Sequence, residues 1–134
     1  MFSFKRACLV TLALVLVTET AFAETFKAKT SWYGAQFQGK RMANGEPFDR
    51  HDPEIVAHKT LPLGTVLLVR NPDTGIGIVT TVQDRGPYVR GRMLDVSSAA
   101  AEILGFKDQG TATLVVTILF KPTKNVYKAD GLDA

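Results

Sequence analysis

Apolar and polar residues alternate along most of the chain, which is the pattern of half-buried β-strands. Alternation predicts strands over 27–33 and 76–83, an apolar run predicts a strand over 66–70, and two brief strands are predicted over 54–57 and 93–96. A sixth strand, 111–120, is almost continuous in β-branched and apolar residues, so we expect it to be buried on both faces. One short helix is predicted over 98–104, with Ser97 as its N-cap and Gly105 as its left-handed C-cap.

Turn-forming residues separate these segments. Residues 34–53 are rich in Gly and Pro and predict a long ordered loop, and loops of this length in small domains usually carry function. Residues 71–75 predict a hairpin loop, and Gly86-Pro87 ends the strand before it. Many short strands with one helix and no internal repeat indicate a single all-β barrel or sandwich.

The first 23 residues have the pattern of a cleavable secretory signal peptide. A basic pair, Lys5-Arg6, precedes an apolar run over 7–17, and Ala21-Phe22-Ala23 provides the cleavage site. The run is too short to span a bilayer comfortably, and Cys8 lies at its start, where lipidation is not expected. We therefore expect an exported protein with no stable membrane anchor after cleavage. The expected parts are a signal peptide (1–23), one domain (24–120) and a tail that is ordered only at its start (121–134).

Charge and cysteine content restrict the function classes. The 134 residues carry a formal charge of +3, and cleavage would leave about +2, which fits an anionic polymer partner as well as ordinary solubility. Cys8 is the single cysteine, so the mature domain has no disulfide, no cysteine nucleophile and no Cys-ligated zinc. No phosphate loop, serine elbow or nucleic-acid motif is present, and we expect neither a nucleic-acid partner nor a cofactor.

Candidate chemistry begins in the long loop. Glu46 and Asp49 are carboxylates three residues apart, and coupling between two carboxylates can keep one protonated, as glycoside cleavage requires. The alternative is two solvated turn residues. His58 at a strand end is either catalytic or structural. Together with His51 these residues match no metal-binding spacing, so no metal site is expected.

A second group of candidates follows the fourth strand. Asp84 is either a reactive carboxylate or the partner of one of three nearby arginines, Arg85, Arg90 and Arg92. Asp95 either belongs to the same site or only complements the amides of the following helix. Five aromatic residues could form a floor on which sugars stack, although some of them could equally be core: Trp32, Tyr33, Phe37, Phe48 and Tyr88.

Nine short blocks of the chain together resemble one known family. They are 30–34 (TSWYG), 37–40 (FQGK), 43–46 (ANGE), 57–65 (AHKTLPLGT), 69–71 (VRN), 84–88 (DRGPY), 91–92 (GR), 95–97 (DVS) and 99–101 (AAA). Spread over residues 28–120, they resemble the pattern of the rare lipoprotein A family. The resemblance implies a six-stranded double-psi β-barrel with one short helix, similar in shape to expansins.

The resemblance also implies a lytic transglycosylase that cleaves the β-1,4 bond between N-acetylmuramic acid and N-acetylglucosamine. The muramoyl 6-hydroxyl closes on C1, which leaves a 1,6-anhydro product. Family matching implies that Glu46, Asp49 and His58 are catalytic candidates and that Asp84 and Asp95 lie in the groove. We expect Glu46 or Asp84 to be the acid/base, with Asp49 and His58 as electrostatic and orienting partners. Substrate contacts are expected at six residues: Trp32, Tyr33, Asn44, Tyr88, Arg92 and Asp95. Peptidoglycan strands are then the partner, and a monomer in the periplasm or outside the cell is expected.

The chain departs from the family pattern in the long loop. Met42 stands where Thr usually precedes Ala-Asn-Gly, and one extra residue separates Asp49 from His58, which could displace the histidine from the loop carboxylates. Two other functions remain open from the sequence. One is a non-catalytic, expansin-like protein that binds cell-wall glycan, and the other is a secreted structural or inhibitor domain with the same barrel.

Overall fold

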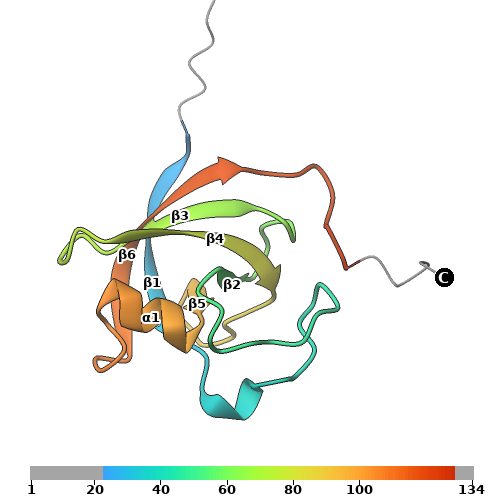
Figure 1. Cartoon of the computed structure of the whole chain (residues 1–134). Coiled ribbons are helices and arrows are strands. Elements are labelled where there is room, and N and C mark those ends of the chain that lie inside the picture. Colours follow the sequence, from blue (N-terminus) through green and yellow to red (C-terminus); the bar gives the residue numbers. More distant parts are fainter. Residues whose placement is uncertain (1–22, 129–134) are drawn as a thin grey trace, which may run out of the picture.

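The computed structural model describes residues 23–128. The signal peptide predicted over 1–23 lies, except for Ala23, outside the described residues, and so do residues 129–134. The described part is one closed barrel with a short helix beside it and a C-terminal segment that runs along one end of the barrel (Figure 1).

The barrel has six strands, which confirms the predicted all-β class. In chain order they are β1 (Thr25–Trp32), β2 (Ile55–His58), β3 (Val66–Arg70), β4 (Gly77–Asp84), β5 (Leu94–Val96) and β6 (Thr111–Phe120). Around the barrel the order is β1-β5-β2-β4-β3-β6, and β6 closes onto β1. β1 pairs with β5, and β2 with β4, in parallel, while the other four pairs are antiparallel. This is the double-psi β-barrel that the resemblance implied.

Apolar side chains from all six strands fill the barrel. The alternation of each strand points one set of residues inward, and the fully buried ones include Val56, Leu67, Val82, Leu94 and Val116. A second, smaller core lies outside the barrel wall, beneath the loop of residues 34–53, and consists of Tyr33, Met42, Phe48, Ile55 and Ala57. Met42, the residue that departs from the family pattern, therefore has a packing role.

The single helix, α1 (Ser98–Leu104), has the bounds and both caps that the sequence predicted. The backbone amide of Ala100 donates to Ser97 Oγ at 3.1 Å, and Gly105 adopts the left-handed conformation with φ of 80°. The helix buries Ala100, Ala101 and Leu104 against the barrel. Its caps therefore come from local sequence, and Asp95 is not needed as one.

Three details of the fold differ from the sequence prediction. β6 is not buried on both faces, because Leu114 and Val116 point inward whereas Leu119 and Phe120 are exposed. The loop over 34–53 contains a short 3-10 helix, η1 (Ala35–Phe37). The segment after β6 packs against the barrel as far as Lys128, whose amide donates to the carbonyl oxygen of Asn44 at 2.7 Å.

Candidate active site

Four residues from four adjacent strands form a row across the outer face of the barrel. The strand register pairs Ser31 of β1 with Asp95 of β5, Asp95 with Ala57 of β2, and Ala57 with Asp84 of β4. Residues paired in register point to the same face of a sheet. The two aspartates are therefore separated by one buried alanine, with their Cα atoms two strand spacings, or about 10 Å, apart.

A β-bulge brings Asp84 into this row. Val56 pairs with Val82, but the next residue, Ala57, pairs with Asp84 and not with Gln83. If the strands paired regularly, without the bulge, Gln83 would lie opposite Ala57, and Asp84 would point toward the inside of the barrel, where Val82 lies. The bulge therefore places the Asp84 carboxylate on the same face as Asp95.

The Asp84 carboxylate is held by three hydrogen bonds from two other segments and its own neighbour. The backbone amides of Ala43 and Arg85 each donate to Oδ1 at 2.9 Å, and the hydroxyl of Tyr33 donates to Oδ2 at 2.7 Å. Within the part of the chain that the structure describes, no arginine side chain donates to Asp84. The carboxylate is thus oriented by fixed donors, which is how a reactive group is preorganised.

Asp95 has a different environment. The Ser31 hydroxyl donates to Asp95 Oδ1 at 2.8 Å, and among residues 23–128 no group donates to Oδ2. Burial raises the pKa of Asp95 from 3.8 to about 6, against the opposing effects of the Ser31 hydrogen bond and the charge of Arg92, and the charge of Asp84 adds to the rise. Near pH 6 this carboxyl group is therefore protonated in about half of the molecules.

Tyr33 connects the site to the second core. Its ring packs against Phe48 with ring centroids 4.4 Å apart, and against Phe37 at 5.5 Å in an edge-to-face arrangement. Burial, and then the hydrogen bond to Asp84, raise the pKa of its hydroxyl far above the usual value, so the hydroxyl remains a donor. Tyr33 and Phe48 are therefore supports beneath the site and not an exposed stacking floor.

Both aspartates open into one pocket of about 560 Å³. Aromatic residues line part of it, and Tyr88, with 81% of its surface exposed, stands at the rim. Four basic residues also line it: Lys40, Arg41, Arg85 and Arg92. Such a site combines carboxyl groups for proton transfer with aromatic and cationic surface for a polar polymer.

Of the predicted substrate contacts, five line this pocket: Trp32, Tyr33, Tyr88, Arg92 and Asp95. Trp32 is half-buried and is fixed by a hydrogen bond from its Nε1 to the carbonyl oxygen of Lys107 at 3.1 Å. The sixth, Asn44, does not line it. Its backbone amide donates to the carbonyl oxygen of Gln83, and it lines a different, smaller depression.

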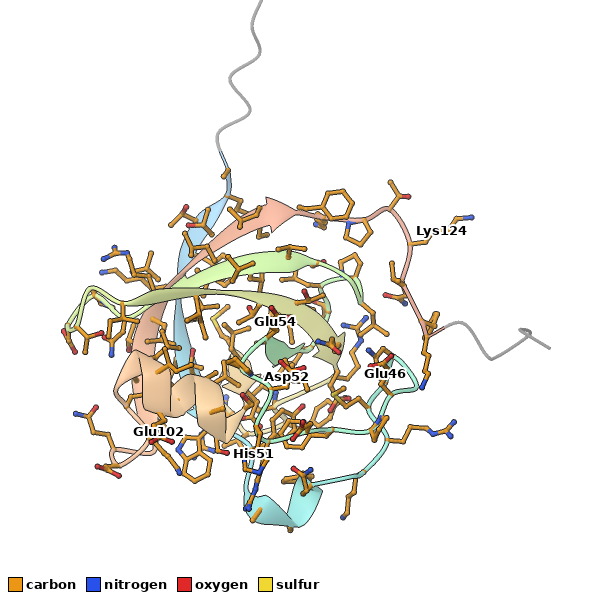
Figure 2. The ribbon with its side chains drawn as sticks, viewed as in Figure 1. Glu46, His51, Asp52, Glu54, Glu102 and Lys124 are labelled. Carbon is orange, nitrogen blue, oxygen red and sulfur yellow. The ribbon has the colours of Figure 1, made fainter. Side chains whose placement is uncertain are left out.

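Glu46 also lies outside the pocket. It lines the same depression as Asn44, next to Val126 and Lys128 of the C-terminal segment. Figure 2 shows Glu46 on the loop that faces this segment. Its backbone amide donates to Asn44 Oδ1 at 3.0 Å, which shapes the turn. The structure thus brings Asp84 and Asp95 together, with Glu46 on the other side of the loop.

Asp49 and His58 have local structural contacts. Asp49 is exposed, and its Oδ1 accepts from the amide of His51 at 3.0 Å, as in an Asx turn. His58 Nδ1 accepts from the amides of Thr60 and Leu61 at 3.1 and 2.9 Å. Neither residue lines the pocket that contains the aspartates.

The electrostatics of His58 agree with its contacts. Burial, followed by the positive charges of Arg85 and Lys59, lowers the pKa of its imidazole, which keeps the ring neutral. A neutral ring leaves Nδ1 with a lone pair, and the two amide donors require that lone pair. This histidine therefore closes the turn that follows β2.

Sequence reasoning did not assign Ser31 or Ala57 to the site. Both lie within blocks that carry the family resemblance, at 30–34 and 57–65, but nothing local signals their function. Ser31 becomes relevant only through the pairing of β1 with β5, and Ala57 only through its position between β4 and β5. Among residues 23–128 no group of three or more His, Cys, Asp or Glu side chains is close enough together to hold a metal ion.

The fold and the site define a class: double-psi β-barrels with two aspartates in a surface pocket beside β2. Comparison with known proteins makes the assignment specific. Residues 25–116 match the family described as "Lytic transglycolase". The chain belongs to this family of RlpA-like double-psi β-barrels.

Named relatives and solved structures extend the comparison. The chain is 40% identical over 114 residues to the endolytic peptidoglycan transglycosylase RlpA of Rickettsia felis. The aligned region covers 83% of this chain and 46% of that protein. Among the curated relatives compared, the chain spans between 25% and 46% of their length.

Two solved structures share the fold. The Streptomyces papain inhibitor matches with a TM-score of 0.58 at 23% identity, over 72% of this chain and 96% of the inhibitor. The apo expansin of Clavibacter michiganensis matches with a TM-score of 0.57 at 24% identity, over 75% of this chain and 52% of the expansin. These two proteins carry different activities by name, so the barrel alone does not determine function. In the described part of the chain, no helix has the length and apolar character needed to cross a membrane.

Proposed function

We propose that this protein is an exported lytic transglycosylase of peptidoglycan, acting as a monomer in the periplasm or outside the cell. Its substrate is the glycan strand, and its product carries a 1,6-anhydro-N-acetylmuramic acid end. The observation that carries the proposal is the pair of aspartates, Asp84 and Asp95, that the two strands on either side of β2 bring to one pocket. The family membership and the names of the relatives support the choice of substrate.

The two carboxyl groups fit the two proton transfers of the reaction. Asp95, which is protonated in about half of the molecules near pH 6, donates a proton to the glycosidic oxygen as the C1–O4 bond breaks. Asp84 accepts the proton of the 6-hydroxyl as O6 bonds to C1, and its negative charge stabilises the oxocarbenium-like transition state. No water is consumed, and one proton enters as another leaves.

The pocket surroundings fit a glycan. Tyr88 and the partly exposed Phe37 offer apolar faces to sugar rings, and Trp32 adds a fixed aromatic wall. The basic residues at the rim favour a polymer that carries carboxylates, as peptidoglycan does. In this proposal Asp84 keeps the acid/base role expected from the sequence, and Asp95 takes the place of Glu46 as the second carboxyl.

The proposal is tested by incubating purified residues 24–134 with peptidoglycan sacculi and analysing the released material by mass spectrometry. We expect anhydromuropeptides from the native protein, and release slower by about 10²- to 10⁴-fold from Asp84→Asn. A sedimentation assay on the same sacculi measures binding. Normal sedimentation of the native protein without any anhydro product would replace the enzyme with a wall-binding protein.

A further inference from the structure

The segment after β6, residues 121–128, runs down one side of the barrel toward the loop of residues 34–53 (Figure 1). It approaches the backbone closely at Gly64, where a Cβ atom would lie only 2.8 Å from Val126 Cγ2. The amide of Val126 donates to the carbonyl oxygen of Leu63 at 2.9 Å. The segment is thus held on the barrel by its backbone as well as by packing.

The side chain of Asn125 anchors this segment to Arg85. Its Oδ1 accepts from the amide of Leu63 at 2.9 Å and from Arg85 Nη2 at 3.1 Å. The other terminal nitrogen of Arg85 donates to the carbonyl oxygens of His58 and Leu61. A flexible, half-buried guanidinium is therefore fixed by three neutral acceptors, one of which belongs to the C-terminal segment.

The C-terminal segment contacts both of the chain segments whose backbone amides donate to Asp84. The backbone amide of Arg85 is one of the two donors to Asp84 Oδ1, and the other is the amide of Ala43. The residue after Ala43 is Asn44, whose carbonyl oxygen accepts from the amide of Lys128 at 2.7 Å. Both donors to this oxygen therefore lie in segments that residues 121–128 hold in place.

We infer that Asn125 is a positioning residue of the active site, because it holds Arg85 and thereby the amide that orients Asp84. This inference rests on the proposed function. Loss of the Asn125 acceptor leaves Arg85 free to turn toward solvent, and the turn over 84–87 then relaxes. Small displacements of a reacting group lower the rate of the chemical step much more than they weaken substrate binding.

Three variants of the full-length mature chain test the inference. Asn125→Ala removes the acceptor, Asn125→Asp keeps an oxygen for Arg85 and Leu63, and Lys124→Ala is a matched control at the neighbouring residue. Lys124 is exposed, and Figure 2 shows its side chain pointing away from the barrel. We expect kcat to fall by about 10- to 100-fold in Asn125→Ala with KM within about twofold, and near-native kinetics in the other two variants.

A second measurement does not depend on activity. The backbone amide resonances of Ala43 and Arg85 report their hydrogen bonds to Asp84, and so does their hydrogen exchange. In Asn125→Ala we expect the Arg85 amide proton to shift upfield and exchange faster, with native values in Asn125→Asp and Lys124→Ala. The melting temperatures of the variants are compared in parallel, to separate local change from loss of stability.

The outcomes are distinguishable. An altered Arg85 amide that is restored in Asn125→Asp supports the positioning role even if the native protein proves inactive on sacculi, which would refute only the proposed function. An unchanged Arg85 amide with native kcat in Asn125→Ala overturns the inference. So does an equal loss in Asn125→Ala and Asn125→Asp that follows the melting temperature, since that result assigns Asn125 to stability alone.

Discussion

The two pairs of carboxylates in this molecule, one on strands and one in a loop, have contrasting surroundings. Asp84 and Asp95 are 11 positions apart in sequence, and β2 brings them into one row across the barrel. Glu46 and Asp49 are neighbours in sequence, but one faces the C-terminal segment and the other caps its own turn. Closeness along the chain therefore did not place carboxylates in one site, whereas sheet register did.

The two pairs of carboxylates also differ in their hydrogen-bond donors and in their contact with solvent. The strand aspartates receive donors from distant segments, and burial raises the pKa of Asp95. The loop carboxylate Asp49 stays exposed and accepts from an amide only two residues away. A carboxylate whose hydrogen bonds come only from its own turn stays in contact with solvent. It therefore lacks the buried surroundings that shift the pKa of a group for proton transfer.

The largest effect on activity is expected when Asp95 is neutralised, which tests whether the strand carboxylates carry the chemistry. We expect Asp95→Asn to lower kcat/KM by about 10²-fold or more, because an amide cannot donate the proton that the leaving oxygen needs. In the native protein, kcat/KM on soluble glycan fragments should fall as the pH rises through about 6, where Asp95 loses its proton. A native pH profile in the variant would assign the proton donor elsewhere.

The same substitution has a predicted effect on stability. The folded-state pKa of Asp95, about 6, lies above the unfolded value of 3.8, so its favourable contribution is full below about pH 4 and is lost as the pH rises through about 6. Allowing for partial solvent contact, we expect Asp95→Asn to be about 1–2 kcal/mol more stable than the native protein at pH 7. Urea unfolding at pH 4 and pH 7 measures this, and an equal difference at both values would contradict the assigned pKa.

A smaller effect is expected at Tyr33, which supports Asp84 from below. Tyr33→Phe keeps the packing on Phe48 but removes the hydroxyl that donates to Asp84 Oδ2. A hydrogen bond to a charged group contributes about 1.5–3 kcal/mol, so we expect kcat to fall by about 10- to 100-fold. Steady-state kinetics measure the loss. An unchanged kcat would show that the backbone amides alone orient the carboxylate.

Tyr88 tests the binding surface in isolation from the carboxylates. Tyr88→Ala removes an exposed aromatic face at the pocket rim, and we expect KM to rise by about 3- to 10-fold with little change in kcat. Val79→Ala, at an exposed apolar residue of β4 that does not line the pocket, is the control. A fall in kcat with unchanged KM would indicate that Tyr88 acts on the transition state.

The smallest effects are expected in the loop. Glu46→Gln and Asp49→Asn should each change kcat/KM by less than about twofold, since neither side chain lines the pocket of the aspartates. The same sacculus digestion measures both. A loss comparable to that of Asp95→Asn in either variant would restore the loop carboxylates as catalytic residues and refute the comparison.

Much of the fold could be predicted because its signals are local. The bounds of β3 follow from a short apolar run, and those of α1 from the caps Ser97 and Gly105, as observed. The error in β6 has a physical reason: apolar residues near its end, such as Phe120, stay exposed, and composition alone does not show which face of a strand is covered.

The site was less accessible to sequence reasoning. Trp32, Tyr88 and Arg92 line the pocket as placed by the family pattern, but the supporting contacts come from register and from distant chain segments. The donor Ala43 lies 41 positions from Asp84, and Asn125 lies in a segment that the sequence presents as a tail. Hydrogen bonds of this kind depend on three-dimensional closure, which no local spacing encodes.

The extra residue at the end of β4 has a consequence for tolerance to change. Deletion of Gln83 would remove the bulge and place Asp84 directly after Val82, opposite Ala57 and still on the outer face, whereas regular pairing of the unshortened strand would turn Asp84 toward the apolar interior. The direction of the Asp84 carboxylate thus depends on the bulge and not on the identity of Gln83. A β4 of the same length that paired regularly to its end would complete the barrel but turn one carboxylate away from the pocket.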